Sequence, residues 1–256
     1  MSKTNLLLIL LSVSIISCGN DRDRETLTQV GTIDALLGGG YDGSLTLGEL
    51  KRNGDFGIGT FDRLNGEMVV LDGRIYQVTA DGKIGNPELS VKTPFAAVTF
   101  FDSDRQVTLP AGTNFDSLTK IIDAALPTQN IFYAIRIEGR FHAVKTRSVP
   151  AQSRPYKVLK EIAATQPIFD FQDVDGTIVG FRCPSYVAGV NVPGYHLHFI
   201  SKDGQAGGHL LAFTVEKAVA QIDDTHRLTM ILPQDNDFYE ADLTVDKQAD
   251  LKKVEK

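Results

Sequence analysis

Three of the five histidines in this 256-residue chain lie in one short segment, "GYHLHFISKDGQAGGH". His196 and His198 are two positions apart, and side chains at i and i+2 of a β-strand point to the same face. Asp203 and the glycines after it predict a turn, so His209 on the returning strand can reach that face. Three imidazoles with an open fourth position are typical of catalytic zinc. Nickel, cobalt, iron and manganese suit similar ligands.

The alternative to a metal site is a set of ordinary strand residues. A single histidine on a strand is usually a core or surface residue, and His-x-His alone does not exclude this. Here the neighbours Leu197, Phe199 and Leu210 are apolar. Three imidazoles aimed into one space among apolar side chains gain no stability unless something pairs them. We therefore predict metal binding, and expect the single His142 and His226 to be structural or surface residues.

The elements that must position these histidines follow from the pattern of residues along the chain. "TIDALL" and "SLTLGELKRNG" predict short helices ended by glycines, the second beginning at Ser44. Asp72-Gly73 between two apolar runs predicts a tight hairpin. "NFDSLTKIIDAAL" predicts an amphipathic helix. We expect a second hairpin turning near Glu138-Gly139, and a short helix in "RPYKVLKEIAATQ" with Pro155 near its start.

The distribution of these elements predicts the fold class. Helices and strands alternate in the first half, whereas the chain from Ile168 onward has mostly the pattern of strands. This arrangement predicts an α+β fold. We expect an N-terminal mixed β-sheet subdomain with helices (27–165). It would pack against a C-terminal, mostly β and barrel-like subdomain (166–256) that carries the metal site and a tail.

The N-terminus "MSKTNLLLILLSVSIISC" has the features of an export signal. Its apolar run is too short to span a bilayer and has the length of a signal-peptide core. "IISC" resembles a bacterial lipobox, so we expect residues 1–17 to be a lipoprotein signal peptide, Cys18 to carry the lipid and residues 18–26 to form a tether. An ordinary signal peptide is the alternative. Either interpretation predicts export, and the lipid predicts anchoring at the cell envelope.

Composition limits the other classes of function. The net charge is −6 and no block of consecutive basic residues exists, which argues against a nucleic-acid partner. No second long apolar run follows the first, so membrane attachment is expected through the N-terminus only. With Cys18 lipidated, Cys183 would have no cysteine partner for a disulfide. The 42% apolar residues are sufficient for an ordinary core.

Three blocks of the sequence together resemble the acetolactate decarboxylase family: "GIGTFDRLNGEMVVLDGRIYQ", "YAIRIEGRFHAVKTRSVPAQSRPY" and "VPGYHLHFISKDGQAGGHLLAF". The resemblance extends from about Leu27 to the end of the chain. It implies decarboxylation of 2-acetolactate to acetoin and carbon dioxide with zinc and no organic cofactor. In that reaction zinc is expected to stabilise an enediolate. The resemblance also implies a tendency to form homodimers.

The resemblance also implies roles for individual residues. His196, His198 and His209 match the zinc ligands of the family. Glu67, in the "GEM" block, matches a carboxylate that reaches the metal site, and Arg147 matches an arginine that lines the substrate pocket. Glu255 matches a glutamate near the end of the chain, with Glu240 as the alternative. The two glutamates are expected to handle the proton, and Arg147 to orient the substrate carboxylate.

Two residues that depart from the family pattern and three rival functions accompany this interpretation. Arg182 and Cys183 stand where the family pattern leads us to expect an aromatic and a small polar residue, so the nearby pocket wall is expected to depart from that of the family. Cys183 is expected to be buried and inert. A cupin-like enzyme would carry a glutamate four to five residues after His-x-His, where this chain has Lys202 and Asp203. A hydrolytic metalloenzyme and a non-catalytic metal-binding lipoprotein are the other two alternatives.

Overall fold

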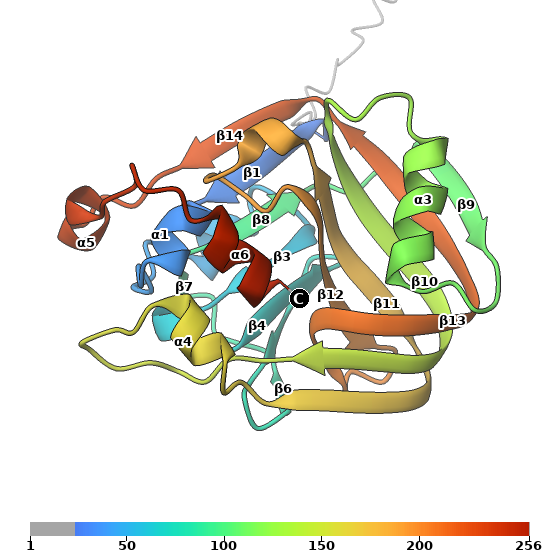
Figure 1. The fold of residues 1–256 in the computed structure, drawn as a ribbon, viewed down its shortest axis with the longest axis horizontal. Helices are drawn as coiled ribbons and strands as arrows, with labels where there is room; N and C mark the ends of the chain where they lie inside the picture. The colour runs from blue at the N-terminus through green and yellow to red at the C-terminus, as the bar shows by residue number, and fades with distance from the viewer. Residues whose placement is uncertain (1–23, 256) are drawn as a thin grey trace, which may run out of the picture.

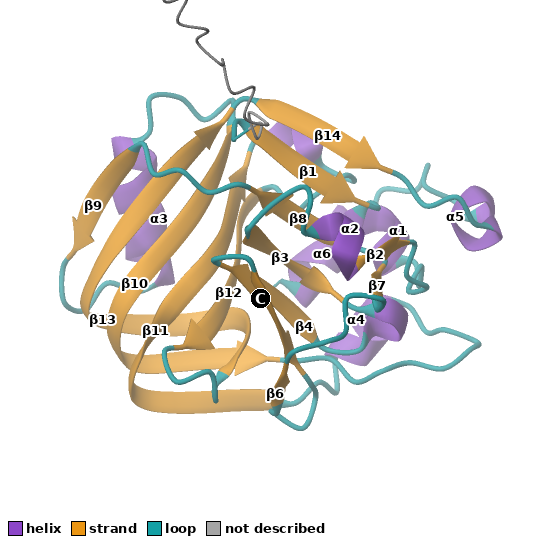
Figure 2. Cartoon of the chain, turned by 180° about the vertical axis from the view of Figure 1, so that it is seen from behind, coloured by secondary structure: helices purple, strands orange, loops and turns teal. Residues whose placement is uncertain are grey.

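The computed structural model describes residues 24–255, which form two large sheets with helices on their outer faces and over one end (Figures 1 and 2). The expected signal peptide (1–17), Cys18 and residues 19–23 of the tether lie outside the described residues. Among the described residues, no helix combines the length and apolar content that crossing a bilayer requires.

The first sheet has seven strands in the order β14-β1-β8-β3-β4-β5-β6. Neighbouring strands are antiparallel except β1 and β14, which run parallel. Their bounds are β1 Thr26–Val30, β3 Phe56–Thr60, β4 Glu67–Leu71, β5 Arg74–Val78, β6 Ile84–Gly85, β8 Ala96–Thr99 and β14 Arg227–Ile231. A separate pair joins β2 (Leu45–Thr46) to β7 (Lys92–Thr93).

The second sheet has five antiparallel strands in the order β10-β11-β12-β13-β9, and β10 also pairs with β13. Their bounds are β9 Arg105–Leu109, β10 Phe132–Arg147, β11 Ile168–Cys183, β12 Gly194–Ser201 and β13 Gly207–Thr225. Figure 2 shows β10, β11 and β13 as long strands that bend strongly along their length. The α+β class expected from the sequence is confirmed.

The main apolar contact joins the two sheets. Phe56, Ile58 and Val69 of the first sheet pack against Val179 and Phe181 of the second, all of them buried. Burial of such side chains contributes roughly 1.5–3 kcal/mol each. Both sheets contain strands from either side of residue 165, so the boundary expected there does not coincide with the division between the sheets.

The helices cover the outer faces and one end of the paired sheets (Figure 1). Helix α3 (Phe115–Ala125) packs Leu118 and Ile122 against the five-stranded sheet, and α2 (Leu47–Leu50) packs against the seven-stranded sheet. Helices α1, α4 and α6 share a third apolar cluster. Their bounds, with those of α5 and two 3-10 turns, are α1 Ile33–Leu37, η1 Asp62–Leu64, α4 Leu159–Ala163, η2 Ser185–Val187, α5 Asn236–Glu240 and α6 Gln248–Val254.

Local predictions were confirmed where a short-range signal sets the structure. Asp72 and Gly73 have φ of 50° and 73° and join β4 to β5, as the tight-turn prediction requires.

The start of helix α2 differs from the prediction, because the helix is capped by Thr46 rather than beginning at Ser44. The Thr46 hydroxyl accepts from the backbone N–H of Glu49, and the Glu49 carboxylate accepts from the backbone N–H of Thr46. This reciprocal capping box fixes the start of the helix.

Two other predictions were wrong. The hairpin expected at Glu138-Gly139 does not exist, because β10 continues from Phe132 to Arg147. Gly139 is explained by close strand approach: a Cβ there would lie 2.2 Å from the Lys217 carbonyl oxygen. Helix α4 begins at Leu159, after the expected position of Pro155 near its start.

Candidate metal centre and active site

Strands β12 and β13 place the three histidines together. His196 and His198 alternate along β12, and His198 lies directly opposite His209 in the antiparallel register. Gly208 precedes His209 with φ of 129°, and a Cβ there would lie 2.4 Å from the carbonyl oxygen of Arg147. Only glycine tolerates both this backbone conformation and this close approach to β10. The "GGH" sequence thereby brings His209 between β12 and β10.

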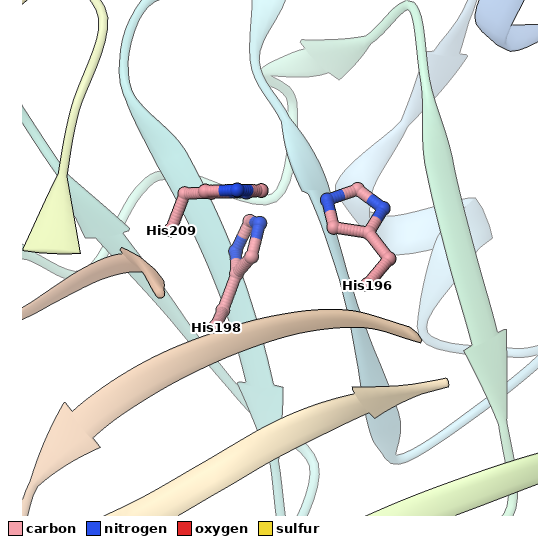
Figure 3. Close-up of side chains that lie close together, drawn as sticks. All are labelled: His196, His198 and His209. Carbon is pink, nitrogen blue, oxygen red and sulfur yellow. The ribbon is translucent and has the colours of Figure 1, made fainter. Parts of the chain in front are cut away.

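The three imidazole rings face one space (Figure 3). Their centroids are 5.2, 5.2 and 5.3 Å apart, and one ring nitrogen from each lies within 4.8 Å of the others. Two nitrogens bound to one zinc at about 2.1 Å are at most about 4.2 Å apart, so the observed spacing is close to that of a shared ion. The side chains of His196, His198 and His209 are buried.

Burial keeps these imidazoles neutral, which is the form that binds metals. Removal from water, followed by the charge of Arg147, lowers the pKa of His196 to about 3. Burial is also the largest cause of the lowered pKa values of His198 and His209. The Nδ1 of His198 lies 2.8 Å from the carbonyl oxygen of Met68. Because a carbonyl only accepts, Nδ1 carries the proton and Nε2 is free to bind a cation.

Glu67 and Arg147 form a buried ion pair beside the histidines. Glu67 is the first residue of β4, and Arg147 is the last residue of β10, opposite His209 in register. The Nη1 of Arg147 donates to Oε1 of Glu67 over 2.9 Å, while Oε2 of Glu67 lies 3.6 Å from Nε2 of His198. Arg147 and Glu67 are only 4% and 6% exposed, so water screens this pair very little.

Glu255 enters the same space from the end of α6. Its Oε2 lies 3.8 Å from Nε2 of His196 and 3.7 Å from Nε2 of His209. These separations are too long for hydrogen bonds. They suit a carboxylate and imidazoles arranged around one ion with bonds of about 2.0 to 2.2 Å. The arrangement therefore fits a divalent transition metal held by three imidazoles, with the carboxylates of Glu67 and Glu255 nearby on two different sides.

The two carboxyl groups have raised pKa values. Burial raises the pKa of Glu67 to about 7, with Arg147 opposing the shift and the charge of Glu255 adding to it. Burial raises the pKa of Glu255 to about 7 as well, again opposed by Arg147. A carboxyl group with a pKa near neutrality is suited to give and take a proton.

A small cavity of about 30 Å³ adjoins these side chains. Its polar wall contains the three histidines, Glu67, Arg147 and Glu255, and its apolar wall includes Ile33, Leu36, Phe95 and Leu159. The structure therefore brings together the three histidines that the spacing singled out and the Glu67, Arg147 and Glu255 that the family resemblance implied. Sequence reasoning missed two features: the hydrogen bond from His198 to the carbonyl of Met68, and the apolar wall of the cavity. The only signal for the hydrogen bond was the position of Met68 next to Glu67.

The remaining candidates lie elsewhere. Glu240 is exposed on α5, and His226 is exposed next to β14. His142 is exposed on β10 near Asp173 and Glu216, and Arg140 already pairs with Glu216. His142 and His226, expected to be structural or surface residues, are therefore both surface residues.

The two departures from the family pattern do not line the cavity. Arg182 donates to the carbonyl oxygen of Gln129 over 2.6 Å, and its Nε lies 3.5 Å from the Asp123 carboxylate. Cys183 is a buried free thiol, as expected, and burial raises its pKa to about 12.

Comparison with known proteins gives the family. The profile described as alpha-acetolactate decarboxylase matches residues 27–245. The chain belongs to the alpha-acetolactate decarboxylase family. The prediction that it is an enzyme of this kind is thereby confirmed, as is the resemblance on which that prediction rested.

Individual relatives of the alpha-acetolactate decarboxylase family agree over most of the chain. The alpha-acetolactate decarboxylase of Methanosarcina mazei is 50% identical over 232 residues, which cover 91% of this chain and 81% of that protein. That of Methylococcus capsulatus is 46% identical over 215 residues, covering 84% and 83%. A crystal structure of alpha-acetolactate decarboxylase from Bacillus subtilis strain 168 superposes with a TM-score of 0.88 at 40% identity, covering 90% of this chain and 99% of that one.

Proposed function

We propose that this chain converts 2-acetolactate to acetoin and carbon dioxide at the three-histidine site, with zinc as its metal. The observation that carries the proposal is the convergence of three buried, neutral imidazoles with an arginine and two carboxyl groups around one cavity. Family membership supports the reaction class. The chemistry of the side chains supports the metal, since neutral imidazole is a common zinc ligand.

His196, His198 and His209 would hold the zinc, and the hydrogen bond from His198 to Met68 would fix the orientation of one ring. When bound there, zinc supplies a positive charge where negative charge develops on the ketone oxygen of the substrate. Because all three ligands are neutral, they leave the charge of the ion undiminished.

Arg147 is the residue suited to hold the substrate carboxylate. Its Nη1 and Nη2 already have acceptors in Glu67 and Val254, but its buried Nε has none among the described residues. A guanidinium can present two parallel N–H groups to a carboxylate, which fixes the orientation of that group. Orientation matters because the bond to the departing carboxylate must stand perpendicular to the plane of the ketone.

Glu67 and Glu255 are suited to handle the proton. Loss of carbon dioxide leaves an enediolate, which must take one proton to give acetoin. With pKa values of about 7, either carboxyl group is partly protonated at neutral pH and can donate. Glu67 approaches His198 from β4, and Glu255 approaches His196 from the end of α6. The two carboxyl groups would therefore reach different sides of the substrate.

The test is a direct assay of products. The purified chain is incubated with racemic 2-acetolactate, and acetoin and carbon dioxide are measured with and without a zinc chelator. We expect acetoin in an enzyme-dependent amount, its loss with chelator, and its return when zinc is added back. Ester cleavage without acetoin would favour the hydrolytic alternative, and zinc binding without either product would favour the non-catalytic one.

We further propose that the chain forms a homodimer through the β14 edge. Among the described residues, β14 ends the strand order of the seven-stranded sheet, and its Leu228 and Met230, with Leu232 just after it, are exposed. Exposed apolar edge strands favour pairing with another chain. Sedimentation of the chain and of Met230→Lys tests this: we expect a dimer that the charge dissociates, and a monomeric parent chain would refute the proposal.

Two expectations from the sequence also stand as proposals. The lipobox-like "IISC" supports export and a lipid on Cys18, and Cys18→Ser should move the protein from the membrane to the soluble fraction. The pairings β10–β11, β11–β12, β12–β13 and β13–β10 return to the starting strand, which supports a barrel-like arrangement, although this ring includes β10 from before residue 165 as well as the three strands after it.

A further inference from the structure

The last helix, α6 (Gln248–Val254), covers the site and carries Glu255 into it. In Figure 1 the end of the chain runs from α6 to the centre of the molecule, beside β4 and β12. Val254 and Glu255 both form part of the cavity wall. The chain therefore supplies one wall of its site from a terminal segment that belongs to neither large sheet.

A few contacts hold α6 in place. Leu251 and Val254 are buried in the apolar cluster that α6 shares with α1 and α4. The Lys160 ammonium lies 3.0 Å from the Asp250 carboxylate, and Nη2 of Arg147 donates to the carbonyl oxygen of Val254 over 3.1 Å. An isolated helix of this length is unstable in water, so these contacts to the body maintain it.

The cavity beneath α6 is too small for the substrate. Its volume of about 30 Å³ holds about one or two water molecules. A cavity of about 150 Å³ accommodates benzene, which has fewer non-hydrogen atoms than this substrate. A molecule with two methyl groups, a ketone, a hydroxyl and a carboxylate cannot enter unless a wall moves.

Of the walls, α6 is the one that can move with least disruption. The histidines, Glu67 and Arg147 stand on strands whose movement would break hydrogen-bond ladders on both sides. Residues 232–247 join α6 to β14, and that segment contains the five-residue helix α5 and no strand. In Figure 1, α5 lies at the periphery of the molecule, away from both sheets.

We infer that α6 is a removable cover over the site, and that Leu251 is a positioning residue whose packing in the apolar cluster places Glu255. The identity of the molecule that enters rests on the proposed function; the movement itself does not. Undocking of α6 releases Nη2 of Arg147 from the Val254 carbonyl. The donor that closes the cover then becomes available to the carboxylate of the incoming substrate.

The test compares Leu251→Ala with Leu118→Ala in the zinc-loaded protein. Both leucines are buried in helices, but Leu118 lies in α3 against the five-stranded sheet and away from the cavity. Loss of zinc to excess chelator is measured first. Truncation of a buried leucine shifts an opening equilibrium by about 30-fold or more. We expect that acceleration in Leu251→Ala, none in Leu118→Ala, and nearly normal release in the volume-conserving Leu251→Met.

The positioning role has its own readout. If Leu251 acts by placing Glu255, then Glu255→Gln lowers kcat strongly in the parent chain and much less in the Leu251→Ala background, because the two changes remove the same contribution. Multiplicative effects on kcat would overturn this role. Equal rates of zinc loss in Leu251→Ala and the parent chain would overturn the cover.

Hydrogen exchange in the unaltered protein provides a measurement that needs no variant. Amides of α6 should exchange much faster than those of β12, because undocking exposes only the former. Equal, slow exchange in both would refute the cover. Accelerated zinc loss in Leu251→Ala together with absence of acetoin in every chain would support the cover and refute the assignment of the substrate instead.

Discussion

Replacement of Arg147 by methionine tests the centre of the site, because it removes the charge while keeping a side chain of similar length. Arg147 is 4% exposed and donates to Glu67 over 2.9 Å and to the Val254 carbonyl over 3.1 Å. The change leaves a carboxylate and a carbonyl without these donors in a space that water scarcely reaches. We expect losses of both stability and activity, for separate reasons.

The expected loss of stability follows from the two hydrogen bonds. Both bonds are donated by a charged guanidinium, and such a bond contributes about 1.5–3 kcal/mol. The free energy of unfolding of the metal-free protein should therefore fall by about 3–6 kcal/mol at pH 8. Because Glu67 can take up a proton, the loss should lie towards the lower end of this range.

The loss of stability caused by Arg147→Met should increase with pH. Burial raises the pKa of Glu67 from 4.5 to about 7 despite the opposing charge of Arg147. A group with a raised pKa in the folded state stabilises the fold below its unfolded pKa, and this contribution is lost as pH rises through the folded pKa. Without Arg147 the folded pKa of Glu67 rises further. The deficit of Arg147→Met should therefore be smaller at pH 5 than at pH 8.

Urea denaturation of the metal-free proteins at both pH values measures the stability, and acetoin formation by the zinc-loaded proteins measures the activity. Arg182→Met is a matched control, since Arg182 is also buried but pairs with Gln129 and Asp123 away from the cavity. Both variants should lose stability, but only Arg147→Met should lose activity, by about 100-fold or more in kcat/KM. A deficit that is the same at pH 5 and pH 8, or unchanged activity in Arg147→Met, would refute the reasoning.

Three further predictions concern single groups. Glu67→Gln should abolish acetoin formation while zinc remains bound, as measured by metal content after dialysis; unchanged turnover would remove Glu67 from proton transfer. Burial raises the pKa of Asp223 from 3.8 to about 8, so it destabilises the fold as pH rises through this range. Asp223→Asn should raise the melting temperature at pH 9 and change it little at pH 4; equal shifts would contradict the assignment. Zinc at about 100 times its Kd should stabilise the parent chain by about 2.7 kcal/mol in denaturation experiments, and a melting temperature independent of zinc would argue against binding to the folded state.

The sequence predicted those parts of the site that depend on local geometry. The two-residue period of a strand placed His196 and His198 on one face, and the glycine-rich turn returned His209 to the same place. Likewise, Asp72-Gly73 predicted the β4–β5 turn because its φ angles are set by the residues themselves. Such signals act within about ten residues and need no knowledge of the rest of the chain.

Features that depend on distant packing were not predictable in this way. Gly139 has the appearance of a turn residue in sequence, yet its lack of a Cβ serves the contact with Lys217 on β13. No pattern near Val254 indicates that its carbonyl would meet Arg147, and the position of Glu255 was expected from family resemblance alone. The pairing of strands across residue 165 was not predictable either: β1 pairs with β14 in one sheet, and β10 pairs with β11 and β13 in the other.

The parallel pairing of β1 with β14 has a consequence for how the chain acquires its shape. Thr26 lies opposite Arg227, so partners about 200 residues apart must meet before the seven-stranded sheet has its full width. Contacts between residues so far apart in the sequence form late and slow the folding of the chain. While β14 is still being synthesised, β1 has a neighbour on one side only. A growing chain therefore remains incompletely assembled almost until its last residues emerge.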